Sequence, residues 1–299
     1  MGHHLLDWSS LKRLSGVQDM RLGQIKPKNK VMAAIFEEGG ARAIPNYTMI
    51  DLIKRSESES VPLAEMAAQL ADSQIEPARP IIPIHPAEVW ACGCTYEISA
   101  TFRDAEVGSR ESFYADVFRE ERPEIFFKGT ARVCVGTGGD IGIRADSHFT
   151  APEPELAVVL GSEGRVLGYT LANDVSAWDI ERENPLYLPQ SKVYSGACAL
   201  GPVIVTPDEI PDPYALTLSC TITRDSKTLF SGTVSIARLA RRVEEMVSFL
   251  LRSNPVPAGS VLLTGTGIIV TEETALAPGD IVTIQMPEIG ELVNIARLV

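Results

Sequence analysis

The sequence predicts an α+β fold in which strands predominate, with a small N-terminal unit ahead of a larger domain. Short runs of apolar and β-branched residues, bounded by turn residues, recur through the chain after residue 86. Their spacing does not match alternating βαβ units, so a doubly wound parallel sheet is not expected. Four prolines within residues 76–86 indicate a stiff, extended connector. We therefore expect a small α+β domain over residues 1–80 and the main domain over residues 86–299.

Composition and charge restrict the classes of partner. Of the 299 residues, 45% are hydrophobic and 22% are charged, as in a globular protein with a substantial core. The net charge of −12 and the lack of a basic cluster argue against nucleic acid as the main partner. No apolar run is long enough to span a bilayer and no signal peptide is recognisable, so we expect no membrane association and a cytoplasmic location.

The cysteines and the first histidines are not expected to take part in a site. The five cysteines are scattered, which favours a reducing compartment. Only Cys92 and Cys94 lie close together, and without a second pair they are interpreted as core residues of a strand rather than zinc ligands. His3 and His4 are either native or the remnant of an affinity tag, and they are left out of the site prediction.

The N-terminal unit is expected to contain a strand, a turn and a return strand, followed by two helices. The second helical pattern begins directly after Pro62, and proline is favoured at the first position of a helix. These elements are expected over residues 31–36, 41–44, 47–55 and 63–71.

The main domain is expected to consist of strands with a few helices. Clean alternation makes residues 215–223 and 228–234 a hairpin. Helical patterns are expected over residues 98–120, 176–182 and 236–252. The other strands are expected over residues 89–96, 123–129, 156–160, 166–172, 200–205, 260–264, 280–286 and 291–298.

The stretch from residue 153 to residue 192 carries the main functional signal. Glu153 and Glu155 lead into the apolar run 156–160, and strand alternation places both side chains on one face, roughly 7 Å apart. A second run, 166–172, leads to Asp174, and an antiparallel return would bring this residue beside the two glutamates. Three carboxylates that meet at one point favour a hard divalent cation, Mg²⁺ before Ca²⁺. The alternative is a solvated edge strand with ordinary surface acids.

Several motifs, taken in order, resemble the fumarylacetoacetate hydrolase family. The resemblance covers roughly residues 86–299, and it rests on the ordered set because a Glu-x-Glu pair alone is a weak signal. The matching pieces are PEIFFKG at 123–129, Glu153 and Glu155, GYTLANDVSA at 168–177, Lys192, LGP at 200–202 and GTG at 265–267.

The resemblance implies a fold, a metal ion and a class of substrate. The catalytic domain would be a mixed β-roll that binds Mg²⁺ or Mn²⁺ and acts on a 2-oxo acid or acylpyruvate. Glu153, Glu155 and Asp174 fall on the metal-ligand positions of the family. The resemblance also implies a homodimer or homotetramer.

One departure from the family pattern bears on the reaction. Hydrolytic members usually carry Asn-Tyr-x-x-His where this chain has TYEIS at 95–99, so Ser99 replaces the histidine that would activate water. Loss of that base removes the usual help of about 10²–10⁴-fold to hydrolysis. The pattern resembles the branch of 2-keto-3-deoxy sugar-acid dehydratases, which includes arabinonate dehydratases. The alternatives are a C–C hydrolase of acylpyruvates or fumarylacetoacetate-like compounds, and a member that binds a ligand without catalysis.

Two residues are candidates for proton transfer through a metal-stabilised enolate. Glu124 would act as a base if burial near other carboxylates raises its pKa. Lys192 would either have its pKa lowered near the ion or stabilise an oxyanion. Without the resemblance, Glu124 is equally well interpreted as a surface acid and Lys192 as a solvated loop lysine.

The remaining candidates would contact the substrate. Lys128 would reach its carboxylate, and Gly265 with Thr266 would offer backbone N–H groups and a hydroxyl where glycines allow close approach. Tyr96 and Arg103 are weaker candidates for the same role. Asn173 is expected to orient a metal ligand.

Overall fold

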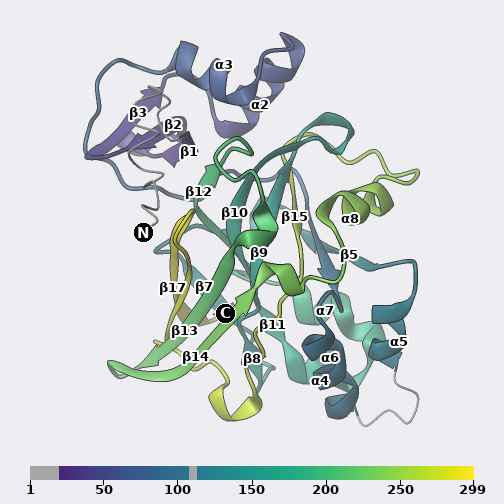
Figure 1. Cartoon of the computed structure of the whole chain (residues 1–299). Helices are drawn as coiled ribbons and strands as arrows, with labels where there is room; N and C mark the ends of the chain where they lie inside the picture. Colours follow the sequence, from purple (N-terminus) through teal and green to yellow (C-terminus); the bar gives the residue numbers. More distant parts are fainter. Residues whose placement is uncertain (1–19, 108–112) are drawn as a thin grey trace, which may run out of the picture.

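The computed structural model describes residues 20–107 and 113–299, whose strands form two large sheets and one short ladder (Figure 1). The larger sheet has ten strands and the smaller has five. From edge to edge, the larger sheet contains β3 (Gly40–Ile44), β2 (Met32–Glu37), β1 (Arg21–Ile25), β12 (Cys198–Val205), β10 (Val166–Asp174), β9 (Pro154–Leu160), β15 (Ser260–Leu263), β4 (Val89–Gly93) and β5 (Glu124–Gly129), with β6 (Cys134–Val135) paired to β12. The smaller sheet contains β14 (Lys227–Ser235), β13 (Thr217–Arg224), β16 (Ile281–Met286), β17 (Gly290–Leu298) and β7 (Asp140–Ile143), and the ladder pairs β8 (Thr150–Ala151) with β11 (Ser176–Ala177).

Helices are few and short, so the expected strand-rich α+β class is confirmed. Four of them, α4 to α7, gather at one end of the larger sheet in Figure 1. The described helices are α2 (Met49–Ser58), α3 (Leu63–Leu70), α4 (Glu97–Val107), α5 (Phe113–Arg119), α6 (Trp178–Glu183), α7 (Leu188–Lys192) and α8 (Val243–Leu250). None of the helices in the described part of the chain has the length and apolar character needed to cross a membrane.

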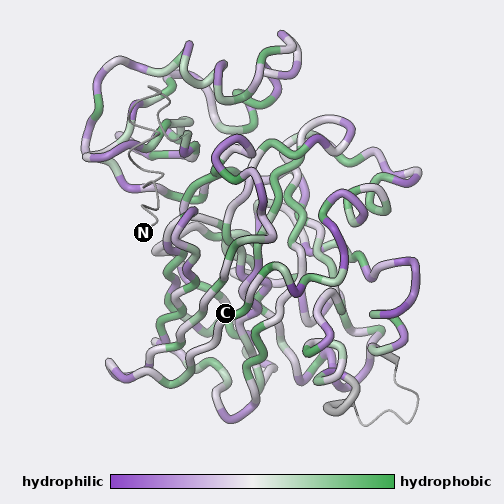
Figure 2. Tube along the Cα trace, in the orientation of Figure 1, coloured by the Kyte–Doolittle hydropathy of each residue, from purple (hydrophilic) through white to green (hydrophobic). Residues whose placement is uncertain are grey.

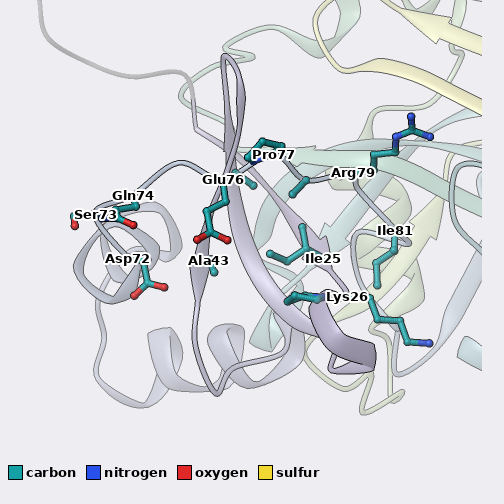
Figure 3. A pocket seen from close by; sticks show the side chains of 13 residues that line it. Ile25, Lys26, Ala43, Asp72, Ser73, Gln74, Glu76, Pro77, Arg79 and Ile81 are labelled. Carbon is teal, nitrogen blue, oxygen red and sulfur yellow. The ribbon is translucent and has the colours of Figure 1, made fainter.

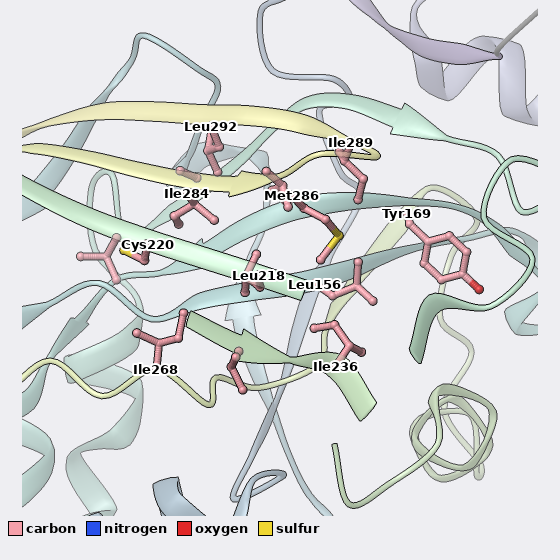
Figure 4. Packing of buried hydrophobic residues seen from close by; sticks show 14 of the residues in the cluster. Leu156, Tyr169, Leu218, Cys220, Ile236, Ile268, Ile284, Met286, Ile289 and Leu292 are labelled. Atoms are coloured by element: carbon pink, nitrogen blue, oxygen red, sulfur yellow. The ribbon is translucent and has the colours of Figure 1, made fainter. Parts of the chain in front are cut away.

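The two large sheets pack face to face around the main core. Figure 4 shows side chains of both sheets meeting there, with Leu156 from the larger sheet and Leu218 and Ile284 from the smaller. The opposite face of the larger sheet is covered as well, because Ala157 and Val159 belong to a second core that includes residues of α2 and α3. Strand β9 is therefore buried on both faces, which explains its uninterrupted apolar sequence. Along the chain, hydrophobic residues concentrate on the inner strands and hydrophilic ones on the outer loops (Figure 2).

The N-terminal strands extend the larger sheet. Strand β1 pairs antiparallel with β12, so β1, β2 and β3 continue the sheet that carries β9 and β10. Helix α2 begins with a capping box in which Thr48 and Asp51 exchange hydrogen bonds. The division into two domains at residues 80–86 stays a prediction.

Several expected elements differ from those observed, among them residues 176–182, where strand β11 comes before helix α6. The pattern over residues 236–252 forms a 3-10 turn at Ile236–Arg238 and then the shorter helix α8, whose buried residues Val243, Met246, Val247 and Leu250 supply its apolar stripe. The pattern over 98–120 gives α4 and α5, with residues 108–112 outside the described part. The segment around Lys192, expected as a polar loop, is helix α7.

Candidate active site

The hairpin of β9 and β10 brings three carboxylates together. Ala172 pairs with Glu155, and the backbone N–H of Asp174 donates to the carbonyl of Glu153 at 2.9 Å. One carboxylate oxygen of each of Glu153, Glu155 and Asp174 lies within 4.8 Å of the others. All three side chains are buried, so this cluster is not a set of solvated surface acids. Asn173 accepts the N–H of Glu153 at 3.0 Å and so fixes the entry to β9.

Two fully buried lysines face this cluster. Lys192 Nζ, at the end of α7, lies 2.9 Å from Glu153 Oε2 and 3.3 Å from Asp174 Oδ2, and donates to Ser176 Oγ at 2.6 Å. Lys128 Nζ, on β5, lies 2.6 Å from Asp174 Oδ1 and donates to the carbonyl of Val175 at 3.0 Å. Since an ammonium has three protons, Lys192 has all of its hydrogen bonds satisfied by the protein.

The environment shifts the pKa values of these groups in different directions. Burial raises the pKa of Asp174, but the neighbouring Lys128 and Lys192 outweigh it and hold this pKa below its usual value. Burial, followed by repulsion from Asp174 and Glu153, raises the pKa of Glu155 well above its usual value. For Lys192, burial lowers the pKa and the adjacent carboxylates raise it, with a net rise. In the protein without a bound ion, Lys192 is therefore a cation with a raised pKa, and the lowered pKa expected beside an ion stays a prediction.

Arg103 on α4 is shared by three further carboxylates. Its guanidinium nitrogens lie 3.7 Å from Glu124, 3.7 Å from Glu153 and 3.6 Å from Glu181, all beyond hydrogen-bond distance. Its guanidinium carbon lies 5.2 Å from the ring centre of Trp178. Glu181, on α6, is 2% exposed and also lies 3.9 Å from Lys192. Sequence reasoning missed Glu181, because it falls in the charged segment DIERE at 179–183 that is typical of an exposed helical turn.

Glu124 lies at the edge of the cluster, on β5. Its side chain retains 22% exposure, but its Oε2 atom is buried and has no hydrogen-bond partner in the described part of the chain. Burial raises the pKa of this carboxyl group, Arg103 opposes that effect, and Glu181 adds to it. A carboxyl group with a raised pKa beside a site is suited to proton transfer near neutral pH.

The Gly-Thr-Gly turn after β15 contacts the cluster through its backbone. The N–H of Gly265 donates to Glu155 Oε2 at 2.5 Å, so it orients a carboxylate of the protein. The Thr266 hydroxyl lies within its own turn, where it accepts the N–H of Ile268 at 3.2 Å. Tyr96 is buried against Gly267, because a side-chain carbon added there would lie 2.7 Å from the tyrosine ring.

The charges of the cluster fit a bound dication. When every group is ionised, the cluster carries two more negative than positive charges. The carboxylates are Glu124, Glu153, Glu155, Asp174 and Glu181, and the cations are Lys128, Lys192 and Arg103. Glu153 Oε1 is buried and lacks a hydrogen-bond partner among the described residues, so one ligand oxygen is not engaged by the protein. An all-oxygen donor set suits Mg²⁺, and Mn²⁺ and Ca²⁺ prefer the same type of ligand. Glu153, Glu155 and Asp174 thus have the chemistry to hold the ion.

A family model agrees with this geometry. The model described as fumarylacetoacetate (FAA) hydrolase C-terminal matches residues 101–297. The chain belongs to the fumarylacetoacetate hydrolase family. The matched range includes the residues of the site: Glu124, Lys128, Glu153, Glu155, Asp174, Glu181, Lys192 and Gly265.

Relatives within the fumarylacetoacetate hydrolase family include named dehydratases. The chain is 47% identical to 2-dehydro-3-deoxy-D-arabinonate dehydratase of Saccharolobus solfataricus over 75% of this chain and 76% of the relative. It is 42% identical to a probable 2-keto-3-deoxyxylonate dehydratase of Haloferax volcanii over 76% of this chain and 78% of the relative. A solved structure described as 2-keto-3-deoxy-D-arabinonate dehydratase complexed with magnesium and 2,5-dioxopentanoate matches with a TM-score of 0.81 and 38% identity, over 94% of this chain and 99% of that chain.

The described histidines of this family member lie outside the cluster. His85 contacts Gln24 at 2.9 Å beside the N-terminal strands. His148 is 72% exposed and lies 2.9 Å from Asp179. Ser99, at the position where hydrolytic members usually carry a histidine, is buried. The described residues therefore place no imidazole beside the carboxylates.

A cavity of about 540 Å³ lies away from this site, in the N-terminal part of the molecule (Figure 3). It is lined by side chains of residues 25–27, of strand β3 and of the segment at residues 72–81. None of them belongs to the carboxylate cluster. The cavity therefore has no part in the chemistry derived from the cluster.

Proposed function

We propose that this chain is a Mg²⁺-dependent dehydratase of a 2-keto-3-deoxy sugar acid such as 2-keto-3-deoxy-arabinonate. The observation that carries the proposal is a buried cluster of carboxylates and cations with no histidine beside it among the described residues. Such a site can hold a 2-oxo acid and move protons, but it lacks the base that would activate water for hydrolysis. The named dehydratases among the relatives support the same choice.

Three residues would hold the ion: Glu153, Glu155 and Asp174. The ion, Mg²⁺ or alternatively Mn²⁺ or Ca²⁺, would supply Lewis acidity to the carboxylate and 2-oxo group of the substrate. Lys128 and Lys192 keep Asp174 ionised, which a metal ligand requires. The Gly265 N–H holds Glu155 in position.

Glu124 would carry the protons and Lys192 would stabilise charge. In the dehydration, Glu124 takes a proton from C3 and passes it to the C4 hydroxyl, which leaves as water. The new C3–C4 double bond then moves to C4–C5, because a proton leaves C5 and one is added to C3, which gives an enol at C5. This enol becomes the aldehyde when its hydroxyl proton is lost and C4 gains a proton, so that the products are one water and 2,5-dioxopentanoate. Lys192 is a buried cation and so stabilises negative charge on the substrate.

The other candidates would position the substrate. Arg103 is placed between Glu124 and Glu153, where a guanidinium can contact a hydroxyl or carboxylate of the sugar acid. Thr266 and Tyr96 flank the turn at Gly267 and would close the same side of the site. Lys128 would reach the substrate carboxylate only by sharing its ammonium with Asp174.

The test is a comparison of substrates with the purified chain in the presence of Mg²⁺. We expect a five-carbon 2-keto-3-deoxy acid, offered in both C4 configurations, to give 2,5-dioxopentanoate, and EDTA to stop the reaction. An acylpyruvate is expected to remain intact. If only the acylpyruvate is consumed, with ¹⁸O from water in the product acid, the protein is a C–C hydrolase. Tight Mg²⁺ binding without turnover of any 2-oxo acid would instead identify a ligand-binding member.

The assembly follows from the resemblance alone, whereas the location follows from the scattered cysteines, which favour a reducing compartment. We propose a cytoplasmic homodimer or homotetramer, and light scattering on the purified chain tests the oligomeric state. A monomer at micromolar concentration would contradict it.

A further inference from the structure

Four buried side chains at the site form a closed ring of alternating charge. Arg103 lies 3.7 Å from Glu153, and Glu153 lies 2.9 Å from Lys192. Lys192 lies 3.9 Å from Glu181, and Glu181 lies 3.6 Å from Arg103. Both cations of the ring thus contact the same two carboxylates. One of those carboxylates, Glu153, is assigned to the metal, and the other has no role in the proposed reaction.

Glu181 is held where both cations can reach it. Helices α6 and α7 pack against each other, and the Ser191 hydroxyl of α7 donates to Glu181 Oε2 at 3.4 Å. The other carboxylate oxygen of Glu181, Oε1, faces Arg103 and has no hydrogen-bond partner among the described residues. A buried carboxylate is costly unless cations or donors surround it, so its placement between Arg103 and Lys192 calls for a physical reason.

The distances around Arg103 supply that reason. Its guanidinium is almost equally far from Glu124, Glu153 and Glu181, and it closes to hydrogen-bond distance with none of the three. This balanced position leaves Glu153 Oε1 without a donor. If Glu181 lost its charge, the attraction on Arg103 would become one-sided, and the guanidinium would move onto Glu153 and Glu124.

We propose that Glu181 is a positioning residue that holds Arg103 away from Glu153 and so keeps Oε1 of Glu153 free for the metal ion. This inference rests on the proposed function, in which Glu153 is a metal ligand. Glu181 itself touches neither the reacting atoms nor the ion. It acts by setting where the Arg103 guanidinium lies, and its negative charge also adds to the attraction for a dication.

The test measures Mg²⁺ affinity by isothermal titration calorimetry, without substrate. Replacing a residue that supports a metal ligand commonly weakens affinity by about 10–100-fold, and we expect Glu181→Gln to fall in that range. Glutamine keeps the size of the side chain and an acceptor for Ser191, so the loss would report charge. Glu181→Asp, which retains the charge on a shorter side chain, is expected to recover part of the affinity.

Glu183→Gln is the matched control. Glu183 lies on the same helix two residues further on and is exposed, so removing its charge is expected to leave the Mg²⁺ affinity within about twofold of the original protein. Thermal unfolding of the metal-free proteins shows whether each variant folds. If Glu181→Gln does not fold, Glu181→Ala, which also removes the charge, takes its place.

The outcomes separate this inference from the proposed function. If the original protein binds no Mg²⁺, the metal-dependent function fails. If it binds Mg²⁺ and Glu181→Gln binds equally well, Glu181 is only a buried structural residue and the inference is overturned. Where Glu181→Gln does not fold, equal binding by Glu181→Ala overturns it. A lowered melting temperature with unchanged affinity would overturn it in the same way.

Discussion

The ammonium of Lys128 lies 2.6 Å from Oδ1 of Asp174, and both side chains are almost completely shielded from solvent. The two residues come from β5 and the end of β10, which are separated in the larger sheet by β9, β15 and β4. A charge pair at this depth is weak evidence of added stability, because both groups lose their hydration. Its clearer effect is to keep Asp174 ionised where burial alone would neutralise it.

Lys128→Met is therefore expected to destabilise the metal-free protein. Removing one partner of a buried ion pair typically costs about 3–5 kcal/mol. The pKa of Asp174 is depressed in the folded protein, so the stability it contributes is present above its ordinary pKa and is lost as pH falls through the folded value. In Lys128→Met the pKa of Asp174 is expected to be higher, so this loss of stability should begin at a higher pH as the solution is acidified. Urea unfolding at several pH values measures both effects.

The control for that experiment is Lys227→Met, at an exposed position on β14. It is expected to change the free energy of unfolding by less than about 0.5 kcal/mol. Equal losses in the two variants would show that the Lys128–Asp174 pair has no particular role.

Asp174→Asn is expected to abolish activity and to weaken Mg²⁺ binding by more than about 100-fold, beyond the range seen for residues that only support a ligand. Asparagine keeps the shape but cannot supply the anionic oxygen that a hard cation prefers. Calorimetric titration with Mg²⁺ checks this. Asp179→Asn, whose carboxylate contacts Ser147 and His148 instead, should bind Mg²⁺ normally. Normal kinetics in Asp174→Asn would remove this residue from the metal ligands.

The pH dependence of Mg²⁺ affinity should be set by Glu155. Its raised pKa means that the metal-free folded protein holds a proton that the unfolded chain has already lost above about pH 4.5. Two consequences follow between pH 4.5 and the raised pKa of Glu155. The metal-free protein loses stability as pH rises through the folded pKa, by at most about 1.4 kcal/mol per pH unit, and Mg²⁺ affinity rises by up to about tenfold per unit.

Proton release on Mg²⁺ binding gives a direct measurement. Titrations in buffers of different ionisation enthalpy should detect about one proton released for each ion bound within this window. Mg²⁺ affinity that does not change with pH, together with no proton release, would contradict a protonated Glu155.

The hairpin and its three acidic residues were predictable from the sequence because strand alternation and antiparallel pairing are local rules. They place Glu153, Glu155 and Asp174 together with no knowledge of the rest of the fold. The opposing cations were less predictable. From the sequence, Lys128 is interpreted as a charged residue at the end of a strand. Only the packing of β5 within the larger sheet brings it to Asp174.

Glu181 could not be found from local pattern at all. Its neighbours Asp179, Arg182 and Glu183 give the segment the polarity of a surface helix. It is buried because α6 packs against α4 and α7, and these contacts join parts of the chain that no periodic pattern connects. Although burial lowers the pKa of Lys192, this pKa is raised overall because of Asp174 and Glu153 first, and Glu181 adds to their effect.

Glu124→Gln separates proton transfer from metal binding. At saturating Mg²⁺ we expect kcat to fall by about 10²–10⁴-fold, the usual contribution of a general base, whatever the change in Mg²⁺ affinity. Exchange of the C3 protons of the substrate with D₂O, followed by NMR, should slow in parallel. Glu121→Gln, at an exposed position nearby, is the control. Exchange at the original rate in Glu124→Gln would assign the base to another residue.

Gly265→Ala tests how closely the turn after β15 must approach Glu155. Gly265 has φ +92°, a conformation that costs a non-glycine residue about 1–3 kcal/mol. An added Cβ would also lie 2.0 Å from the Thr95 hydroxyl, so the turn would have to shift and its N–H would leave Glu155. We expect a large loss of stability together with weaker Mg²⁺ binding.

Gly279→Ala provides the matched comparison. Gly279 has φ +96°, but an added Cβ there has no atom within 4 Å, so this variant changes the backbone preference alone. The difference in melting temperature between the two variants therefore measures the loss of stability caused by the steric clash at Gly265. Mg²⁺ affinity should fall only in Gly265→Ala. Equal losses of stability with normal Mg²⁺ binding in both would mean that the turn relaxes without moving Glu155, and that its hydrogen bond to Gly265 does not prepare the metal site.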